Sequence, residues 1–213
     1  MDRPLEAAVL VPIKSFDAAK ARLASVLGPN DRAELARWCA GRVVAAAAPL
    51  EIAVVCDDDE VATWATGQGA TVVWAAGLGL DAAVGYGLEQ VRLGGDRPVI
   101  VAHGDLPLAR GLVDLVVSDT LTLVPDHADD GTNVIVIPAG VSFDFTYGRR
   151  SFARHLRTAL GIGCAVAVRR DPLLALDLDT PTDLVHPLVR PLVQEVLATW
   201  LPTNRVNLPT PAR

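Results

Sequence analysis

The stretch RPVIVAHGD, residues 97–105, is the clearest buried strand of the sequence, and it ends in a glycine and a carboxylate. A short, continuous apolar run of this kind is typical of a strand covered on both faces by helices. Asp105 follows the strand directly, and Pro107 turns the chain away from it. Ligands of parallel sheets bind beyond the carboxyl ends of the strands, so Asp105 is a first candidate for a functional side chain.

Strand-like and helix-like segments alternate on both sides of this stretch. The alternation predicts an α/β fold, with one mostly parallel sheet and helices on both of its faces. Further strands are expected at 7–13, 51–57, 70–75, 120–126, within 127–140, and at 164–170 and 174–179. Helices are expected at 30–48, 59–68, 79–93, about 109–118, 149–160 and from 180 onward, where Pro187 and Pro191 leave the middle undecided.

Composition restricts the classes of partner. The 213 residues carry a formal net charge of −6, which argues against nucleic acid or an anionic membrane as a partner. No uncharged apolar stretch approaches the ~20 residues of a membrane span. Cys39, Cys56 and Cys164 are too far apart for a metal motif and are expected to be reduced and buried. These features predict a cytoplasmic protein of one domain.

Three cations follow the first predicted strand, in the stretch VLVPIKSFDAAKARLA at 9–24. Lys14 ends the strand, and Lys20 and Arg22 lie on the loop behind it. Cations that converge beyond a parallel strand suit a polyphosphate, although a loop that is basic by chance has the same composition. The phosphate-loop motif G-x-x-x-x-G-K-[ST] is absent, and no G-x-G-x-x-G follows the first strand.

Three carboxylates are candidates for a metal site. Asp177 and Asp179 are two residues apart, so in an extended segment both point to the same side. Together with Asp105 they would form the hard oxygen site that Mg²⁺ prefers. The alternatives are a turn or helix cap at Asp105, a solvated edge at the other two, and a helix N-cap at Asp179.

Four motifs in this order, VPIKSFDAAKARL, GDLPL, FTYGRRSFARH and LDLDTPTDL, resemble the 2-phospho-L-lactate/phosphoenolpyruvate guanylyltransferases of coenzyme F-420 biosynthesis. The resemblance runs from about Ala8 to Leu184. It implies a Rossmann-like three-layer domain of the molybdenum-cofactor nucleotidyltransferase type, extending over 1–200 with a flexible tail at 201–213. It also implies the transfer of a guanylyl group from GTP to a small phosphorylated acid, with release of pyrophosphate.

The resemblance also implies roles for individual residues. The residues implied to act in catalysis are three cations and one carboxylate, Lys14, Lys20, Arg22 and Asp105. The residues implied to bind Mg²⁺ are Asp105, Asp177 and Asp179. The nucleotide would contact Lys14, Gly79, Leu80, Asp81 and Asp105, and the acid would contact Thr132, Gly148 and Ser151. His155, one turn after Ser151, is expected to pack or to bond to that serine, with an anion contact as the alternative.

Two departures from the family pattern leave alternatives open. Relatives carry an asparagine where this chain has Asp81, and a proline and a small or acidic residue where it has Arg149 and Arg150. Three hypotheses therefore compete with this one. The enzyme uses another base, it uses another phosphorylated acceptor, or the protein binds a nucleotide without catalytic activity. The sequence does not decide the oligomeric state, for which a homodimer is a candidate.

Overall fold

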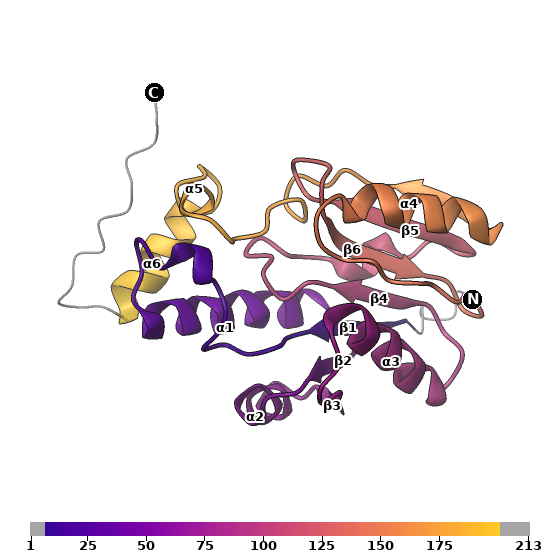
Figure 1. The fold of residues 1–213 in the computed structure, drawn as a ribbon, viewed down its shortest axis with the longest axis horizontal. Helices are drawn as coiled ribbons and strands as arrows, with labels where there is room; N and C mark the ends of the chain where they lie inside the picture. Colours follow the sequence, from indigo (N-terminus) through magenta and orange to yellow (C-terminus); the bar gives the residue numbers. More distant parts are fainter. Residues whose placement is uncertain (1–6, 201–213) are drawn as a thin grey trace.

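The computed structural model describes residues 7–200, which form one seven-stranded sheet in the order β3-β2-β1-β4-β6-β5-β7 (Figure 1). Only β6 runs against its neighbours among these strands, since β4–β6 and β5–β6 are antiparallel and the other pairs are parallel. The predicted α/β fold with a mostly parallel sheet is confirmed. The tail predicted at 201–213 lies outside the described residues.

The strands fall close to the predicted apolar runs. They are β1 (Ala8–Pro12), β2 (Glu51–Cys56), β3 (Thr71–Trp74), β4 (Val99–Ala102), β5 (Thr120–Pro125), β6 (Thr132–Ile137) and β7 (Ala165–Val168). The α-helices are α1 (Pro29–Ala46), α2 (Asp59–Gly67), α3 (Leu80–Leu93), α4 (Ser151–Ile162), α5 (Pro181–Leu184) and α6 (Arg190–Trp200). Two short 3-10 helices are η1 (Ala21–Leu23) and η2 (Leu112–Leu115).

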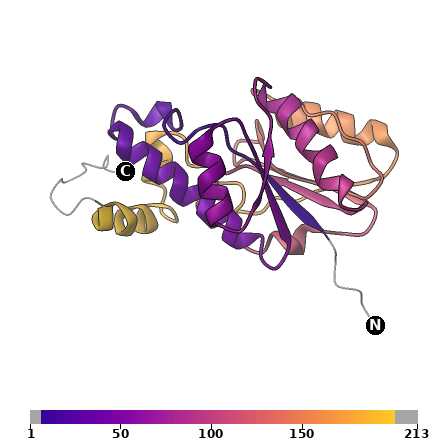
Figure 2. The ribbon, with the colours of Figure 1, turned by 90° about the horizontal axis from the view of Figure 1, so that it is seen from below.

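Helices cover the two faces of the sheet in pairs, which gives the predicted three layers (Figure 2). Val9 and Val11 of β1 point into the core under α1 and α2, whereas Leu10 points into the core under α3 and α4. Successive residues of β1 are thus buried on opposite sides, which explains its continuous apolar sequence. A Cβ at Gly87 of α3 would lie 2.9 Å from Leu10, so the glycine allows α3 to pack directly on β1.

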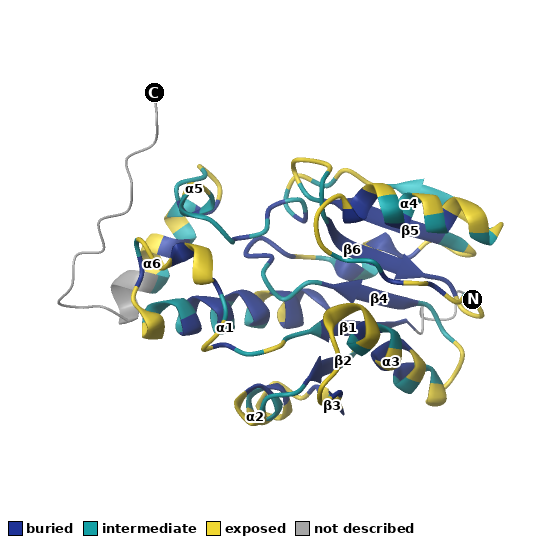
Figure 3. Cartoon of the chain, in the orientation of Figure 1, coloured by how far each residue is buried: buried dark blue, intermediate teal, exposed yellow. Residues whose placement is uncertain are grey.

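A third apolar cluster lies beyond the carboxyl ends of the strands. It joins Leu23 of η1, Leu35 of α1, Leu178, and Leu184 and Val193 of the last two helices. In Figure 1 these elements gather around one end of α1, away from the sheet, and Figure 3 shows buried residues on the sides that face each other. The cluster anchors two segments, 13–23 and 176–184, over the edge of the sheet where ligands of this architecture bind.

Three predicted elements are wrong or altered. The helix expected at about 109–118 is reduced to η2, because Gly111 adopts the left-handed φ of 56° and interrupts it. The strand expected at 174–179 is absent, since this segment turns and then runs extended without joining the sheet. The helix expected from 180 onward is split into α5 and α6, with Pro187 in the break.

Candidate active site

The carboxyl ends of β1, β2 and β4 meet at one edge of the sheet, as the register pairs of these parallel strands require. Two hollows lie beyond this edge and share Pro12, Ile13 and Lys14 as a common wall. The larger has a volume of about 270 Å³, and the smaller about 80 Å³. Lys14 is exposed between them, so a ligand that spans both hollows would pass its ammonium group.

The larger hollow contains a buried ion pair. Lys20 Nζ lies 3.4 Å from Asp105 Oδ2, and the lysine side chain is only 5% exposed. Lys20 has a left-handed φ of 56°, a conformation that non-glycine residues rarely adopt and that clusters at functional sites. The backbone at Lys20 is therefore held in an unusual conformation that places the ammonium group against Asp105.

Each member of this pair stabilises the charge of the other. Burial lowers the pKa of Lys20, but the carboxylates of Asp105 and Asp179 outweigh burial, and the pKa is raised overall. Burial raises the pKa of Asp105, but Lys20 and His103 outweigh it, and the pKa is lowered overall. Both groups are consequently charged at neutral pH, although they lie in a largely desolvated site.

Asp177 and Asp179 lie beside Asp105. The Leu178 N–H donates to the carbonyl oxygen of Asp105 at 3.0 Å, and the Leu178 side chain is buried in the third cluster. The two flanking side chains therefore leave the extended segment on the opposite side from Leu178. Burial, followed by the nearby charge of Asp105, raises the pKa of Asp177 to about 6.

Arg22 contacts the last of these carboxylates. Its Nη1 lies 2.7 Å from Asp179 Oδ2, and its side chain is 74% exposed. Asp179 is not the N-cap of α5, because Thr180 occupies that position in a capping box with Asp183. Of the six residues predicted to handle phosphate and metal, four line the larger hollow: Lys14, Lys20, Asp105 and Asp179. Arg22 contacts Asp179, and Asp177 is near enough to Asp105 for the charge of that carboxylate to raise its pKa.

The site fits a magnesium ion that shares its coordination with phosphate. Within residues 7–200, no group of three His, Cys, Asp or Glu side chains is close enough to enclose a metal ion. Mg²⁺ is usually held by one or two carboxylates, with water and substrate phosphates as further ligands. Asp105 Oδ1 is buried without a hydrogen-bond partner in this part of the chain, and no cation of the described residues forms an ion pair with Asp177, so hard oxygen ligands are available.

The predicted base-binding residues lie at the start of α3. Leu80 lines the smaller hollow together with Cys56 and Asp57, and Gly79 is the N-cap of the helix. Asp81 Oδ1 accepts a hydrogen bond of 2.7 Å from the Tyr147 N–H. One carboxylate oxygen of Asp81, which the resemblance places at the nucleotide, therefore already accepts a hydrogen bond from the segment that precedes α4.

The predicted acid-binding residues lie together at the same edge of the sheet. Because β6 is antiparallel to β4, its first residue, Thr132, lies beyond the carboxyl end of β4. The Ser151 N–H at the start of α4 donates to the Gly148 carbonyl, and Gly148 has a φ of 97° that favours glycine. Arg149 and Arg150, next to them, are exposed.

His155 is buried and packs against Phe143 and Tyr147, as one of the two expectations for it states. Its Nδ1 lies 3.0 Å from Thr132 Oγ1, and its Nε2 accepts from the Thr146 N–H at 2.9 Å. The expected bond to Ser151 does not form. The ring is fully buried and links β6 to the segment before α4.

Some residues that build the site have no signal in the sequence. Asn133 is buried and donates through Nδ2 to the Leu174 carbonyl, which fixes the segment that carries the two late carboxylates. Tyr147 stacks edge-on against His103, with ring centroids 4.7 Å apart. Both contacts join segments that are distant in sequence, so neither periodicity nor residue spacing reveals them.

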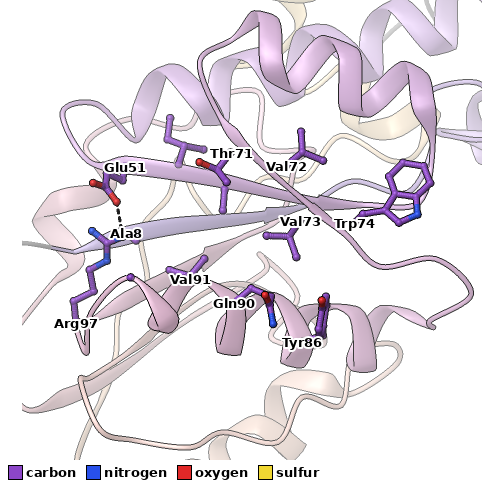
Figure 4. A pocket seen from close by; sticks show the side chains of 13 residues that line it. Ala8, Glu51, Thr71, Val72, Val73, Trp74, Tyr86, Gln90, Val91 and Arg97 are labelled. Carbon is purple, nitrogen blue, oxygen red and sulfur yellow. Dashed lines mark hydrogen bonds and ion pairs between the residues drawn. The ribbon is translucent and has the colours of Figure 1, made fainter.

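A larger hollow lies elsewhere on the described part of the chain. Its volume is about 480 Å³, and it runs between β3 and α3 (Figure 4). Its lining mixes apolar and polar side chains, and Glu51 and Arg97 form an ion pair at one end. Size alone does not identify the active site here, because the polar groups that could bind a phosphate lie around the two smaller hollows.

No helix among the described residues is long and apolar enough to cross a membrane.

Comparison with known proteins identifies the family. The model of the guanylyl transferase CofC-like family matches residues 7–190. The chain belongs to this family. It is 34% identical over 186 residues to phosphoenolpyruvate guanylyltransferase of Rubrobacter xylanophilus, covering 83% of this chain and 91% of that protein. It is 36% identical over 203 residues to the protein of the same name from Streptosporangium roseum, covering 89% and 88%.

Solved structures support the fold. A Desulfovibrio desulfuricans protein, provisionally described as a nucleotide-diphospho-sugar transferase, matches with a TM-score of 0.65 and 20% identity, covering 84% of each chain. A nucleotidyl transferase from Methanothermobacter matches with a TM-score of 0.58 and 15% identity, covering 91% of this chain and 99% of the other. The CofC-like chain therefore has the fold of the nucleotidyltransferases.

Proposed function

We propose that this protein is a magnesium-dependent guanylyltransferase that joins GTP to a small phosphorylated carboxylic acid, phosphoenolpyruvate or 2-phospho-L-lactate. A phosphate oxygen of the acid attacks the α-phosphorus of GTP, and the bond from that phosphorus to the bridging oxygen of the β-phosphate breaks. Pyrophosphate leaves, and the product is a guanosine diphosphate derivative of the acid. This places the reaction in coenzyme F-420 biosynthesis.

The buried Lys20–Asp105 pair at the carboxyl edge of the sheet is the observation that carries this proposal. Its members lie 3.4 Å apart in a hollow that is also lined by Lys14 and Asp179. Positive and negative groups that alternate in one hollow match a triphosphate and its metal ion, which carry the opposite pattern of charge. A protein that only packed its core would gain little from burying these charges.

Phosphoryl and nucleotidyl transfer require positioning and charge neutralisation more than covalent chemistry. Lys14, Lys20 and Arg22 would bind the triphosphate and stabilise the charge that develops on the leaving pyrophosphate. Asp105, together with Asp177 or Asp179, would hold Mg²⁺, which neutralises phosphate oxygens when it is bound. The third apolar cluster, beneath the segment 176–184, keeps these groups in place.

The acid would bind where β6 and α4 begin. Thr132 and Ser151 offer hydroxyl donors to an anion, while the Ser151 N–H is already bonded to the Gly148 carbonyl. Arg149 and Arg150 are exposed beside them and would attract the carboxylate of the acid. The relatives described above are named for phosphoenolpyruvate, which makes this acid the first to test.

A coupled pyrophosphate-release assay tests the proposal. GTP and Mg²⁺ are combined with phosphoenolpyruvate, 2-phospholactate or 3-phosphoglycerate, and either of the first two should release pyrophosphate. Asp105→Asn should lower turnover at least ~100-fold, the scale of losing one charge-stabilising element. Full activity in excess chelator would exclude the metal, and an inactive wild type with all three acids would contradict the function.

A further inference from the structure

His155 occupies an unusual position for a histidine in a helix that packs on a sheet. It lies on α4 one turn after Ser151, is fully buried, and touches two other segments through its two ring nitrogens. Nε2 is 2.9 Å from the Thr146 N, and Nδ1 is 3.0 Å from Thr132 Oγ1. The rings of Phe143 and Tyr147 lie against it, with centroids at 5.6 and 5.0 Å, so its orientation is fixed.

These contacts determine where the ring proton lies. A backbone N–H can only donate, so Nε2 must present its lone pair to Thr146. A neutral imidazole then carries its proton on Nδ1, because each neutral ring has one donor and one acceptor nitrogen. Burial lowers the pKa of His155 to about 4, so the ring is neutral at physiological pH.

The tautomer of His155 in turn determines the role of Thr132. With a proton on Nδ1, His155 donates to Thr132 Oγ1, and the hydroxyl accepts that bond. The hydroxyl still has its own proton to donate, because the contact with His155 is the one hydrogen bond that Oγ1 makes among the described residues. A buried donor without a protein partner is costly unless a ligand or water accepts from it. Thr132 is 3% exposed and lies at the sheet edge where the acid would bind.

From this geometry we infer that His155 is a positioning residue of the acid subsite, which orients the Thr132 hydroxyl so that it donates to an oxygen of the anionic substrate. The inference rests on the proposed function and adds to it a residue that does not touch the substrate. A hydroxyl held in this way selects an oxyanion as its ligand, because an oxyanion accepts hydrogen bonds and donates none. His155 also joins Thr132 to Thr146, so it sets the spacing between β6 and the segment that leads to Ser151.

Two substitutions of His155 separate this role from simple packing. In His155→Asn the side-chain amide can donate from about the position of Nδ1, so the bond to Thr132 is kept. In His155→Gln the amide reaches the position of Nε2, so the bond to Thr146 is kept and the donor to Thr132 is lost. His127→Gln, at an exposed histidine outside the site, is the matched control.

The experiment measures KM for phosphoenolpyruvate and for GTP separately. His155→Gln should raise KM for phosphoenolpyruvate about tenfold, the effect of one hydrogen bond, and should leave KM for GTP within about twofold. His155→Asn should stay within about threefold of the wild type for both substrates. Thr132→Val should match His155→Gln, and the double variant should be no worse than Thr132→Val alone, because both changes remove the same donor.

The tautomer is tested without turnover. The ¹⁵N spectrum of labelled histidine should show the His155 Nδ1 protonated and Nε2 unprotonated, with the signal assigned by its absence in His155→Gln. A proton on Nε2 would overturn the inference. Equal rises in both KM values, or additive effects in the double variant, would also overturn it while leaving the guanylyltransferase function intact.

The two hypotheses fail in different ways. If the wild type releases no pyrophosphate, the function fails, and the inference is then judged by calorimetric binding of phosphoenolpyruvate with Mg²⁺. Tenfold weaker binding in His155→Gln than in His155→Asn would still support it. Equal binding in the two variants, or no binding to the wild type, would overturn it.

Discussion

The Leu178 N–H donates a hydrogen bond of 3.0 Å to the carbonyl oxygen of Asp105, and this one contact places the late carboxylates beside the early one. Leu178 is completely buried among apolar residues of η1, α1 and α5. The segment therefore cannot slide. Asp179 lines the hollow, and Asp177, two residues before it, leaves the extended segment on the same side. Burial of an apolar side chain is here the means by which two charged groups are oriented.

The charged Asp177 side chain should destabilise the folded protein, although activity needs this charge. Its pKa is raised to about 6 by burial and by Asp105, so the folded protein favours its protonated form. The stability that this proton contributes is present below the ordinary pKa of about 4 and is lost as the pH rises through 6. The free energy of unfolding of Asp177→Asn should therefore be about 1–2 kcal/mol higher than that of the wild type at pH 8, and this difference should disappear toward pH 4.

Urea unfolding between pH 4 and pH 8 measures this difference. Asp144→Asn, at an exposed carboxylate, is the control and should follow the wild type at every pH. The stabilised Asp177→Asn variant should nevertheless lose pyrophosphate release about 100-fold, because a charge-stabilising group is gone. A pH-independent difference in stability would show that Asp177 is not held at a raised pKa.

Arg22 should matter for turnover and hardly at all for stability. Its ion pair with Asp179 is made by a side chain that is 74% exposed, and exposed pairs contribute little to folding. Arg22→Ala should change the free energy of unfolding by less than about 0.5 kcal/mol, yet lower kcat/KM for GTP at least tenfold. Arg170→Ala breaks the comparable exposed pair with Asp129 and should change neither quantity. Equal effects of the two substitutions on activity would remove Arg22 from the site.

The regular elements were predictable because their sequences match the environment of a two-faced sheet. Val99–Ala102 is apolar throughout because β4 is buried on both sides, and the helices on either face alternate with such runs. The turn at Asp130-Gly131 signals the reversed direction of β6, because a short connection of this kind joins antiparallel strands. The alternation in 174–179 resembles a strand, but Leu176 and Leu178 are buried in the third apolar cluster rather than on a sheet.

The candidate site was predictable as far as single residues carry chemistry. Lys20, Asp105 and Asp177 stand out because charges follow apolar runs. Their pairing was not predictable, because it depends on a left-handed backbone at Lys20 and on the hydrogen bond between Leu178 and Asp105. These are contacts between distant segments, and only the folded chain contains them.

Asp81 is expected to fix the position of the segment before α4, in addition to any contact with the guanine base. Its Oδ1 accepts from the Tyr147 N–H at 2.7 Å, so the start of α3 is tied to the acid-binding segment. Asp81→Asn keeps a carbonyl acceptor and should leave KM for the acid within about threefold, whereas Asp81→Ala should raise it about tenfold. Glu89→Ala, on an exposed face of the same helix, is the control.

Measurement of both KM values decides between the two roles of Asp81. If the carboxylate reads guanine, Asp81→Asn and Asp81→Ala should both raise KM for GTP and leave KM for the acid unchanged. A thermal-shift panel with the four nucleoside triphosphates and Mg²⁺ adds the base preference, because a bound ligand stabilises the folded state. Equal shifts for all four in the wild type would contradict guanine selectivity.

The Lys20–Asp105 pair provides the sharpest test of the site, because its two charges are coupled. Lys20→Met removes the cation and leaves Asp105 largely buried without its partner. Breaking a buried pair in this way costs about 3–5 kcal/mol, and the 32% exposure of the Asp105 side chain lowers the expected loss to about 2 kcal/mol. The double variant Lys20→Met/Asp105→Asn removes the unpaired charge and should recover most of that loss. Both variants should be at least ~100-fold less active, since catalysis needs the charges and not only the fold. If urea unfolding instead shows losses that add up in the double variant, the two residues do not stabilise each other, and the hollow they line is not organised around this pair.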